Sequence, residues 1–368
     1  MTTKHYPLKS PKGSGESSSP SISTLLPSAP ANPLARRDLC SITDLSPSDI
    51  RLILDVAHDV KAQPQRYRHA LDAKQLTMFF EKESLRTRLT FEAGINTLGG
   101  SAIFIDQTAS RLGERETLAD VAHNLERWVD VIVLRTYAHE TITGMARFAN
   151  VPVVNALSDL EHPCQALTDI FTLEEHFGDL RGLQIAYVGD GNNVARSLLL
   201  AAVGMGAHIS LASPVGYGID ANFLAAAQAI AESSGSAVRS VVDPREGVQG
   251  ADAVYTDAWT SMGQEQETTI RQRIFQPYQV DSDLMALAAP HAVFMHCLPA
   301  HRGEEVTNEV IDSAQSIVFD QAENRLHVQK AILLLLLDAA HLQGNGSGPD
   351  EAKYRRGIVR KRSPIPKY

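Results

Sequence analysis

The chain has 368 residues, a formal net charge of −9 at neutral pH and 43% hydrophobic residues. This length predicts two domains, each with its own core, and the acidic balance argues against nucleic-acid binding. The longest apolar run, Ile332 to Leu337, is far too short to cross a bilayer, so no membrane partner is predicted either.

The predicted elements begin after a leader. Residues 1–35 are rich in Ser, Pro and Gly and carry no apolar periodicity, so we predict that they are disordered. The leader lacks the apolar core of a secretory signal. We favour a cytoplasmic protein, and the Ser-rich, acid-poor composition leaves an organelle transit peptide as the alternative. The three cysteines, Cys40, Cys164 and Cys297, have no paired spacing, which indicates a reducing compartment.

In the first half of the chain, strands alternate with helices. Ser46 is expected to cap a first helix, with Pro47 at its first position and Asp49 completing a capping box. The strands that follow are predicted at residues 76–80, 101–105, 130–134 and 151–155, with helices after residue 84 and at 118–129, 142–148 and 166–177. The last of these helices is long enough to bridge two domains.

The second half repeats this alternation. Strands are predicted at residues 183–188, 208–212, 253–256, 293–296 and 316–320, and helices at 194–203, 221–233 and 329–341. The pattern predicts two open parallel-sheet α/β domains, with functional residues at the carboxyl ends of the strands. We expect a first domain at 36–170, a second at 171–328, a helix at 329–343 that packs back on the first domain, and a basic flexible tail at 344–368.

The stretch Ser84-Leu85-Arg86-Thr87-Arg88 lies where a predicted strand turns into a helix. Free backbone N–H groups and the positive end of the helix dipole favour an anion there. The two guanidiniums and two hydroxyls of this stretch suit phosphate oxygens. The alternative is an ordinary charged helix start on the surface.

Gly189 to Asn193 follows a strand and opens a helix, as in dinucleotide-binding proteins. The glycine motif of those proteins is incomplete here, because Val194 occupies the position of its third glycine. The next strand also lacks the acidic residue at its end that would bind a ribose. An NAD-dependent oxidoreductase is therefore disfavoured. Asn193 still places an amide at a strand end, where it suits a carboxylate or an amine.

Two further stretches carry side chains suited to chemistry. His162-Pro163-Cys164-Gln165 brings an imidazole and an amide together at the domain junction, close to the strand-end residue Arg135. His296 to Gly303 leaves an apolar strand with a cysteine, two histidines and an arginine in one loop. This loop suits a thiol nucleophile or, less well, a metal, because adjacent ligands on an extended chain do not converge. Asp257 and residues 261–263 follow another strand.

The ordered set of these motifs resembles the carbamoyltransferases of the aspartate/ornithine carbamoyltransferase family, and most closely the ornithine branch. The resemblance covers about residues 36–341 and rests on SLRTR (84–88), Arg135, HPCQ (162–165), GDGNN (189–193), TDAWTSMG (256–263), HCLPAHRGEEV (296–306) and ENR (323–325). Cys297-Leu298-Pro299 separates the chain from the aspartate branch, where Pro-Leu-Pro stands. The family usually has Thr at the position of Leu85, and Leu also occurs in relatives that use acylated ornithines.

The resemblance implies a site shared by the two domains. The implied carbamoyl phosphate-binding residues are Ser84, Leu85, Arg86, Thr87, Arg135, His162, Gln165, Cys297, Leu298 and Arg325. The implied ornithine-binding residues are Asn193, Asp257, Ser261 and Met262. Arg135, His162 and Cys297 are the implied catalytic residues; Cys297 would orient the amine and handle its proton rather than attack.

The implied activity is transfer of the carbamoyl group of carbamoyl phosphate to the δ-amine of L-ornithine, which gives L-citrulline and phosphate in arginine biosynthesis. The resemblance implies no metal or organic cofactor and a homotrimer or a multiple of trimers. A carbamoyltransferase for a related amine, such as N-acetylornithine or putrescine, is the closest alternative. A non-catalytic binding protein on the same scaffold is the other.

Overall fold

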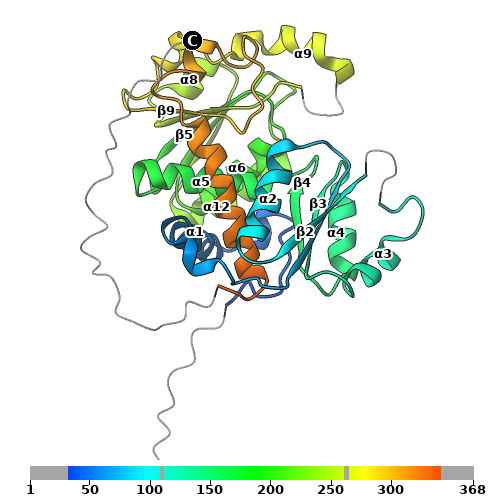
Figure 1. Ribbon diagram of the computed structural model, residues 1–368. Helices are drawn as coiled ribbons and strands as arrows, with labels where there is room; N and C mark the ends of the chain where they lie inside the picture. Colours follow the sequence, from blue (N-terminus) through cyan, green and yellow to red (C-terminus); the bar gives the residue numbers. More distant parts are fainter. Residues whose placement is uncertain (1–31, 108–111, 261–264, 341–368) are drawn as a thin grey trace, which may run out of the picture. The chain divides into compact units, whose positions relative to one another are not determined.

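The structure is a computed structural model and describes residues 32–107, 112–260 and 265–340. Two parallel sheets form its frame, one with the strand order β2-β1-β3-β4 and one with the order β7-β6-β5-β8-β9 (Figure 1). The strands are β1 Gln75–Phe80, β2 Ser101–Asp106, β3 Val131–Arg135, β4 Val153–Leu157, β5 Gln184–Val188, β6 His208–Ala212, β7 Val238–Val241, β8 Ala253–Thr256 and β9 Val293–Met295. The predicted pair of parallel-sheet α/β domains is confirmed.

Helices connect these strands. The α-helices are α1 Pro47–Ala62, α2 Leu85–Thr97, α3 Leu118–Leu125, α4 His139–Phe148, α5 Pro163–Phe177, α6 Asn193–Gly204, α7 Ala221–Ser234, α8 Pro244–Val248, α9 Thr268–Phe275, α10 Ser282–Met285, α11 Asn308–Ile311 and α12 Val318–Leu336. Short 3-10 helices occupy η1 Ile42–Asp44, η2 Pro64–Tyr67, η3 Glu265–Glu267 and η4 Gln276–Tyr278. Among the described helices, none has the length and apolarity that a bilayer crossing requires.

Helix α1 begins as its sequence predicts. The Ser46 hydroxyl accepts a hydrogen bond from the Asp49 backbone N–H at 3.1 Å, and the Asp49 carboxylate accepts one from the Ser46 backbone N–H at 3.0 Å. Pro47 at the first position lacks only an N–H that would have no helical partner there. The helix then buries an apolar face that includes Ile50 and Ile53.

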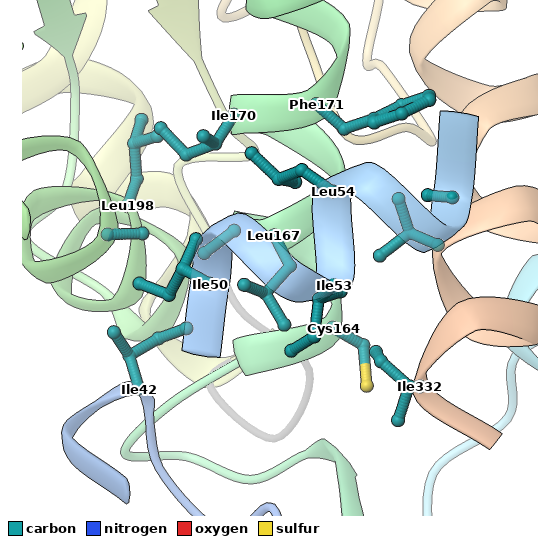
Figure 2. Packing of buried hydrophobic residues seen from close by; sticks show 14 of the residues in the cluster. Ile42, Ile50, Ile53, Leu54, Cys164, Leu167, Ile170, Phe171, Leu198 and Ile332 are labelled. Atoms are coloured by element: carbon teal, nitrogen blue, oxygen red, sulfur yellow. The ribbon is translucent and has the colours of Figure 1, made fainter. Parts of the chain in front are cut away.

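Two helices join the sheets. Helix α5 runs from the end of β4 toward the second sheet and packs against α6 and α12, while α12 also packs against α1 and α2 (Figure 1). Figure 2 shows side chains of α1, α5, α6 and α12 meeting in one apolar cluster, with Ile53, Leu167 and Ile332 among them. Because burial of such side chains stabilises each by about 1.5–3 kcal/mol, this cluster contributes to holding the helices of the two halves together.

The predictions near the carboxyl end of the chain were partly wrong. The expected strand at 316–320 is a single parallel bridge between Ser316 and Phe294. Helix α12 begins at Val318 rather than at residue 329, so position 328 lies inside it. A short apolar run cannot by itself distinguish a strand from a buried helix, and here the run at 317–319 opens the helix, with Asp320 in its first turn.

Other boundaries differ less. Helix α3 ends at Leu125 rather than at residue 129, and β9 ends at Met295. The sequence did not predict β7, nor α8 to α11. Strand β7 has only four residues, none of them buried, at the edge of the sheet, and these helices have four to eight residues, so neither gives a clear periodic pattern.

An ion cluster on the outside of α5 gives a test of how α1 and α5 hold together. The Glu174 carboxylate accepts hydrogen bonds from Arg51 and, at 2.9 Å, from His58, both on α1. Burial alone would raise the pKa of Glu174, but these hydrogen bonds and the charge of Arg51 lower it to about 2. The ionised form is therefore stabilised by folding, and this contribution is present above about pH 4.5 and is lost as the pH falls toward 2.

We expect Glu174→Gln to lower the free energy of unfolding at pH 7 by about 1–2 kcal/mol, a value reduced for partial solvent screening. Urea denaturation of the two proteins at several pH values measures it, and the difference should shrink between pH 4.5 and 2. Asp179→Asn, which weakens the exposed pair with Arg181, is the control and should change stability much less. A difference that stays constant with pH would instead indicate lost packing.

Candidate active site

The carboxyl ends of strands from both sheets border one cavity of about 1270 Å³. The first sheet contributes the segments after β1 and β3, and the second contributes the segments after β5, β8 and β9. Helices α2 and α6 begin at this cavity. This is the edge where parallel α/β sheets bind ligands.

The start of α2 forms one wall of the cavity. Ser84 caps the helix, and its hydroxyl accepts a hydrogen bond from the Thr87 backbone N–H at 3.3 Å. Leu85 and Arg86 also line the cavity, and the Leu85 side chain is 71% exposed. Arg88 does not line it: its guanidinium lies 3.8 Å from the centre of the Phe104 ring and 3.6 Å from Glu92. The prediction that both guanidiniums of this stretch face the anion site was therefore wrong for Arg88.

Three guanidiniums meet at this wall: Arg86, Arg135 at the end of β3, and Arg325 on α12. Burial and the charges of Arg325 and Arg86 lower the pKa of Arg135 to about 9. Burial also lowers the pKa of Arg325, to which the Arg86 charge adds. Such mutual repulsion is relieved by a bound anion, and a phosphate suits these planar donors.

Arg325 reaches the cavity from the helix that joins the two domains, and not from the second sheet. One of its amino groups, Nη2, donates a hydrogen bond to the Thr87 hydroxyl at 2.6 Å. This bond places Arg325 directly over the start of α2. Because the Thr87 oxygen accepts this bond, the hydroxyl hydrogen of Thr87 points away from Arg325.

His162 and Gln165 form the floor at the start of α5, and both are buried. Burial, with the nearby charges of Arg325 and Arg135, lowers the pKa of His162 well below its ordinary value, so its imidazole is neutral at pH 7. Its backbone N–H donates to the Ser197 hydroxyl at 2.9 Å, which fixes the first turn of α5 against α6. Its Nδ1 atom has no hydrogen-bond partner among the described residues.

The second sheet contributes an acidic wall. The Cys297 thiol, after β9, donates a hydrogen bond to Asp257 Oδ1 at 3.1 Å. Asn192 caps α6, and its Nδ2 donates to Asp257 Oδ2 at 2.8 Å. Both oxygens of this carboxylate are thus held in place, and the remaining lone pairs suit a cationic group.

The segment after β9 is fixed by a buried histidine. The Leu298 backbone N–H donates to His296 Nδ1 at 2.8 Å, and His296 Nε2 lies 3.1 Å from the Glu305 carboxylate. Leu298 has a φ of +59°, which a leucine adopts rarely and which directs the chain at Pro299 along the cavity wall.

A metal bound by Asp257, His296 and Cys297 is not favoured. Ligand atoms of Asp257, His296 and Cys297 lie within 4.8 Å of one another. However, His296 Nδ1 accepts from Leu298 and Nε2 pairs with Glu305, so neither ring nitrogen has a free lone pair for a metal. The geometry supports a thiol held beside a carboxylate.

The cavity also includes residues that the sequence did not single out. Asn193 was predicted; its Nδ2 donates to the Ser158 carbonyl at 2.6 Å, across to the first domain. Its neighbour Asn192, which holds Asp257, was missed although it belongs to the same motif. Arg271 was missed because α9 was not predicted; it donates to Asp190 at 2.9 Å and ties the turn after β5 to α9.

Of the predicted site residues, twelve are brought to the same cavity: Ser84, Leu85, Arg86, Thr87, Arg135, His162, Gln165, Asn193, Asp257, Cys297, Leu298 and Arg325. The predicted ornithine contacts Ser261 and Met262 lie outside the described residues.

The cysteine at this site gives a chemical test. Burial and the Asp257 carboxylate raise the pKa of the Cys297 thiol well above its ordinary value, so the reactive thiolate is scarce at pH 7.5. We expect iodoacetamide to alkylate Cys297 at least about tenfold more slowly than a free thiol, and Asp257→Asn to speed the reaction. Mass spectrometry of the Cys297 peptide measures it, and Cys40 and Cys164, both with pKa values raised to about 12 by burial, serve as unreactive references. Alkylation as fast as that of a free thiol would contradict this reading.

Two parallel-sheet domains with a guanidinium cluster on one wall and a held carboxylate on the other define an α/β protein that brings an anion and an amine together. Sequence comparison is specific about its family. The model of the aspartate/ornithine carbamoyltransferase carbamoyl-P binding domain matches residues 37–175, and that of the Asp/Orn binding domain matches residues 181–336. The chain belongs to the aspartate/ornithine carbamoyltransferase family.

Close relatives are ornithine carbamoyltransferases. The chain is 51% identical to the ornithine carbamoyltransferase of Acidothermus cellulolyticus over 301 residues, and the match covers 82% of this chain and 96% of the relative. It is 49% identical to the ornithine carbamoyltransferase of Bacillus subtilis, in a match that covers 82% of this chain and 94% of that relative. The solved ornithine carbamoyltransferase of Pyrococcus furiosus has a TM-score of 0.81 and 46% identity, covering 83% of this chain and 98% of that one.

Proposed function

We propose that this chain is an ornithine carbamoyltransferase, a transferase that moves the carbamoyl group of carbamoyl phosphate to the δ-amine of L-ornithine. The observation that carries the proposal is that Arg86, Arg135 and Arg325 line the same cavity as the Asp257 carboxylate, with the neutral Cys297 thiol hydrogen-bonded to that carboxylate. One wall suits a phosphate and the other a cationic amino acid. The relatives described above support the same assignment.

On the first wall, the phosphate of carbamoyl phosphate lies against the start of α2. Ser84, Leu85, Arg86 and Thr87 contact it with side chains or backbone N–H groups, and Arg325 covers it from α12. The helix N-terminus adds its partial positive charge. This arrangement stabilises the charge that develops on the leaving phosphate.

The carbonyl oxygen of the carbamoyl group points toward Arg135 and His162. As the amine attacks, the oxygen gains negative charge, which the guanidinium stabilises and the neutral imidazole supports by donating its N–H. Gln165, with the backbone at Cys297 and Leu298, holds the carbamoyl NH₂ group. Positioning of this kind accounts for much of such a reaction.

On the second wall, Asp257 binds the α-amino group of ornithine, and Asn193 binds its carboxylate; Ser261 and Met262 are proposed contacts as well. Cys297 lies beside the δ-nitrogen. The neutral δ-amine forms a bond to the carbonyl carbon, the bond from that carbon to the phosphate oxygen breaks, and the nitrogen loses one proton, which the departing phosphate takes up. The products are L-citrulline and phosphate, with no metal or organic cofactor.

The proposal extends to the protein's setting. We propose a cytoplasmic enzyme of arginine biosynthesis that works as a homotrimer or a multiple of trimers, with neither nucleic acid nor membrane as a partner. We also propose the domain limits 36–170 and 171–317, so that the second domain ends before α12, together with the leader at 1–35 and the tail at 344–368. Light scattering of the purified chain tests the assembly.

A substrate panel tests the activity. The purified protein is assayed for phosphate release from carbamoyl phosphate with ornithine, N-acetylornithine, putrescine and aspartate side by side. Ornithine should give the highest kcat/KM, by about 10²-fold or more, because the held carboxylate of Asp257 suits a free α-amino group. Preference for N-acetylornithine would instead favour the acyl-ornithine relatives that carry Leu at position 85.

A further inference from the structure

A buried carboxylate lies directly behind the floor of the cavity. Asp169 is one helical turn after Gln165 on α5 and is fully buried. Its Oδ1 accepts a hydrogen bond from Gln165 Nε2 at 2.8 Å and a second from Gln321 Nε2, on α12, at 2.7 Å. Neither Asp169 nor Gln321 lines the cavity, so the proposed chemistry does not use them directly.

These hydrogen bonds fix which end of each amide points where. An ionised carboxylate has no hydrogen to donate, so both glutamines turn their NH₂ groups toward Asp169. For Gln321 the other end confirms this, because its Oε1 accepts the backbone N–H of His296 at 3.0 Å. Gln165 lines the cavity, and with its NH₂ group turned toward Asp169 its other polar atom is the carbonyl oxygen Oε1. This oxygen is buried and has no hydrogen-bond partner among the described residues.

We propose that Asp169 is a positioning residue that holds Gln165 with its carbonyl oxygen toward the ligand, so that the site selects an acyl phosphate bearing an N–H donor. This inference rests on the proposed carbamoyl transfer and deepens it. A carbamoyl group offers such a donor; an acetyl group of nearly the same shape offers a methyl group. An amide free to turn would present its NH₂ group instead and repel the carbamoyl NH₂.

Protonation of Asp169 does not undo this arrangement. Burial raises the pKa of Asp169 to about 7, against the hydrogen bonds from Gln165 and Gln321 that lower it. Because Oδ1 accepts from two donors and Oδ2 has no partner among the described residues, Oδ2 is the oxygen that can take up a proton without displacing a donor. The acceptor that orients Gln165 remains in either state.

The same carboxylate connects the two domains. Through Gln321 it reaches the backbone of His296, the residue before Cys297, and Gln321 Nε2 also lies 3.1 Å from the Tyr255 hydroxyl on β8. The floor that faces the carbamoyl group and the segment that carries the thiol are therefore set by one network. An unpaired polar atom in a buried network is costly, so the Gln165 Oε1 atom left without a partner among the described residues favours a ligand that donates to it.

The test compares two ligands that differ at one group. In Asp169→Leu, which removes the acceptor at similar volume, the KM for carbamoyl phosphate should rise at least about tenfold, while the inhibition constant of acetyl phosphate changes less than about threefold. Asp169→Asn keeps an oxygen for the two amides and should stay within about threefold of the wild type for both ligands. Equal weakening of both ligands in the leucine variant, or an asparagine variant as impaired as the leucine one, would overturn the proposal.

A second pair of variants serves if the leucine protein does not fold. Gln165→Glu sets two carboxylates against each other, and adding Asp169→Asn restores a donor between them while leaving an oxygen toward the ligand. The double variant should recover at least about tenfold of the kcat/KM for carbamoyl phosphate that Gln165→Glu loses. No recovery would contradict the inference. An inactive wild-type protein would contradict the proposed function instead, so the two failures are distinguishable.

Discussion

Replacing Arg86 by Gln should reduce kcat/KM for carbamoyl phosphate by roughly 10²–10³-fold, because one preorganised cationic donor to the phosphate is lost. Arg86 is half-buried at the cavity wall, where burial already lowers its pKa. A phosphate that compensates this cluster loses most when one of its guanidiniums is removed. Steady-state assays with carbamoyl phosphate varied at saturating ornithine measure the change.

Arg88→Gln is the matched control for this prediction. It removes the same charge two residues further along α2, from a side chain that stacks on Phe104 and does not line the cavity. It should stay within about threefold of the wild type, since exposed charges contribute little. Circular dichroism should show both variants folded. If the two variants lost activity equally, general electrostatics and not a phosphate contact at Arg86 would explain the loss.

The regular part of the fold could be predicted from the sequence because its signals are local. The capping box at Ser46 sets the start of α1 at the predicted residue, and the apolar run before Glu81 sets β1 within one residue of the predicted limits. The start of α12 could not be predicted in this way. Its N-cap residue, Ile317, donates its backbone N–H to the Phe294 carbonyl on β9, and the bridge from Ser316 to Phe294 lies directly before it, so contacts distant in the sequence set this end.

The same distinction between local and distant signals applies to the residues of the site. Residues at strand ends, such as Arg135 and Asp257, could be assigned to one cavity because parallel strands bring their carboxyl ends to one edge. The direction of the Arg88 side chain could not be predicted, since it depends on the Phe104 ring of a neighbouring strand. The pairing of Asp169 with Gln321 could not either, because it joins residues 152 positions apart.

The charges of the cavity are separated in a way that fits the proposed reaction. Guanidiniums occupy the wall at α2, the carboxylate of Asp257 occupies the opposite wall, and the groups between them, His162 and Cys297, are neutral at pH 7 because burial shifts both pKa values. An amine attacks only in its neutral form, which is favoured where no carboxylate lies close enough to raise its pKa. The neutral middle of the cavity provides that place.

Replacing Asp257 by Asn should reduce kcat/KM for ornithine by roughly 10²-fold, because the variant loses the anionic partner of the α-amino group while it keeps a similar shape. The KM for carbamoyl phosphate should change less than about threefold, since the guanidinium wall is untouched. Assays with ornithine varied at saturating carbamoyl phosphate, and the reverse, separate the two effects.

Asp252→Asn is the matched control for Asp257. Asp252 precedes the same strand at its other end, where its carboxylate accepts the Gln184 backbone N–H at 2.8 Å and pairs with His291, outside the cavity. This variant removes one negative charge from the same strand and should leave both constants near the wild-type values. Were Asp257→Asn to raise the KM for carbamoyl phosphate alone, the carboxylate would belong to the other substrate. The assignment of the second wall to ornithine would then be wrong.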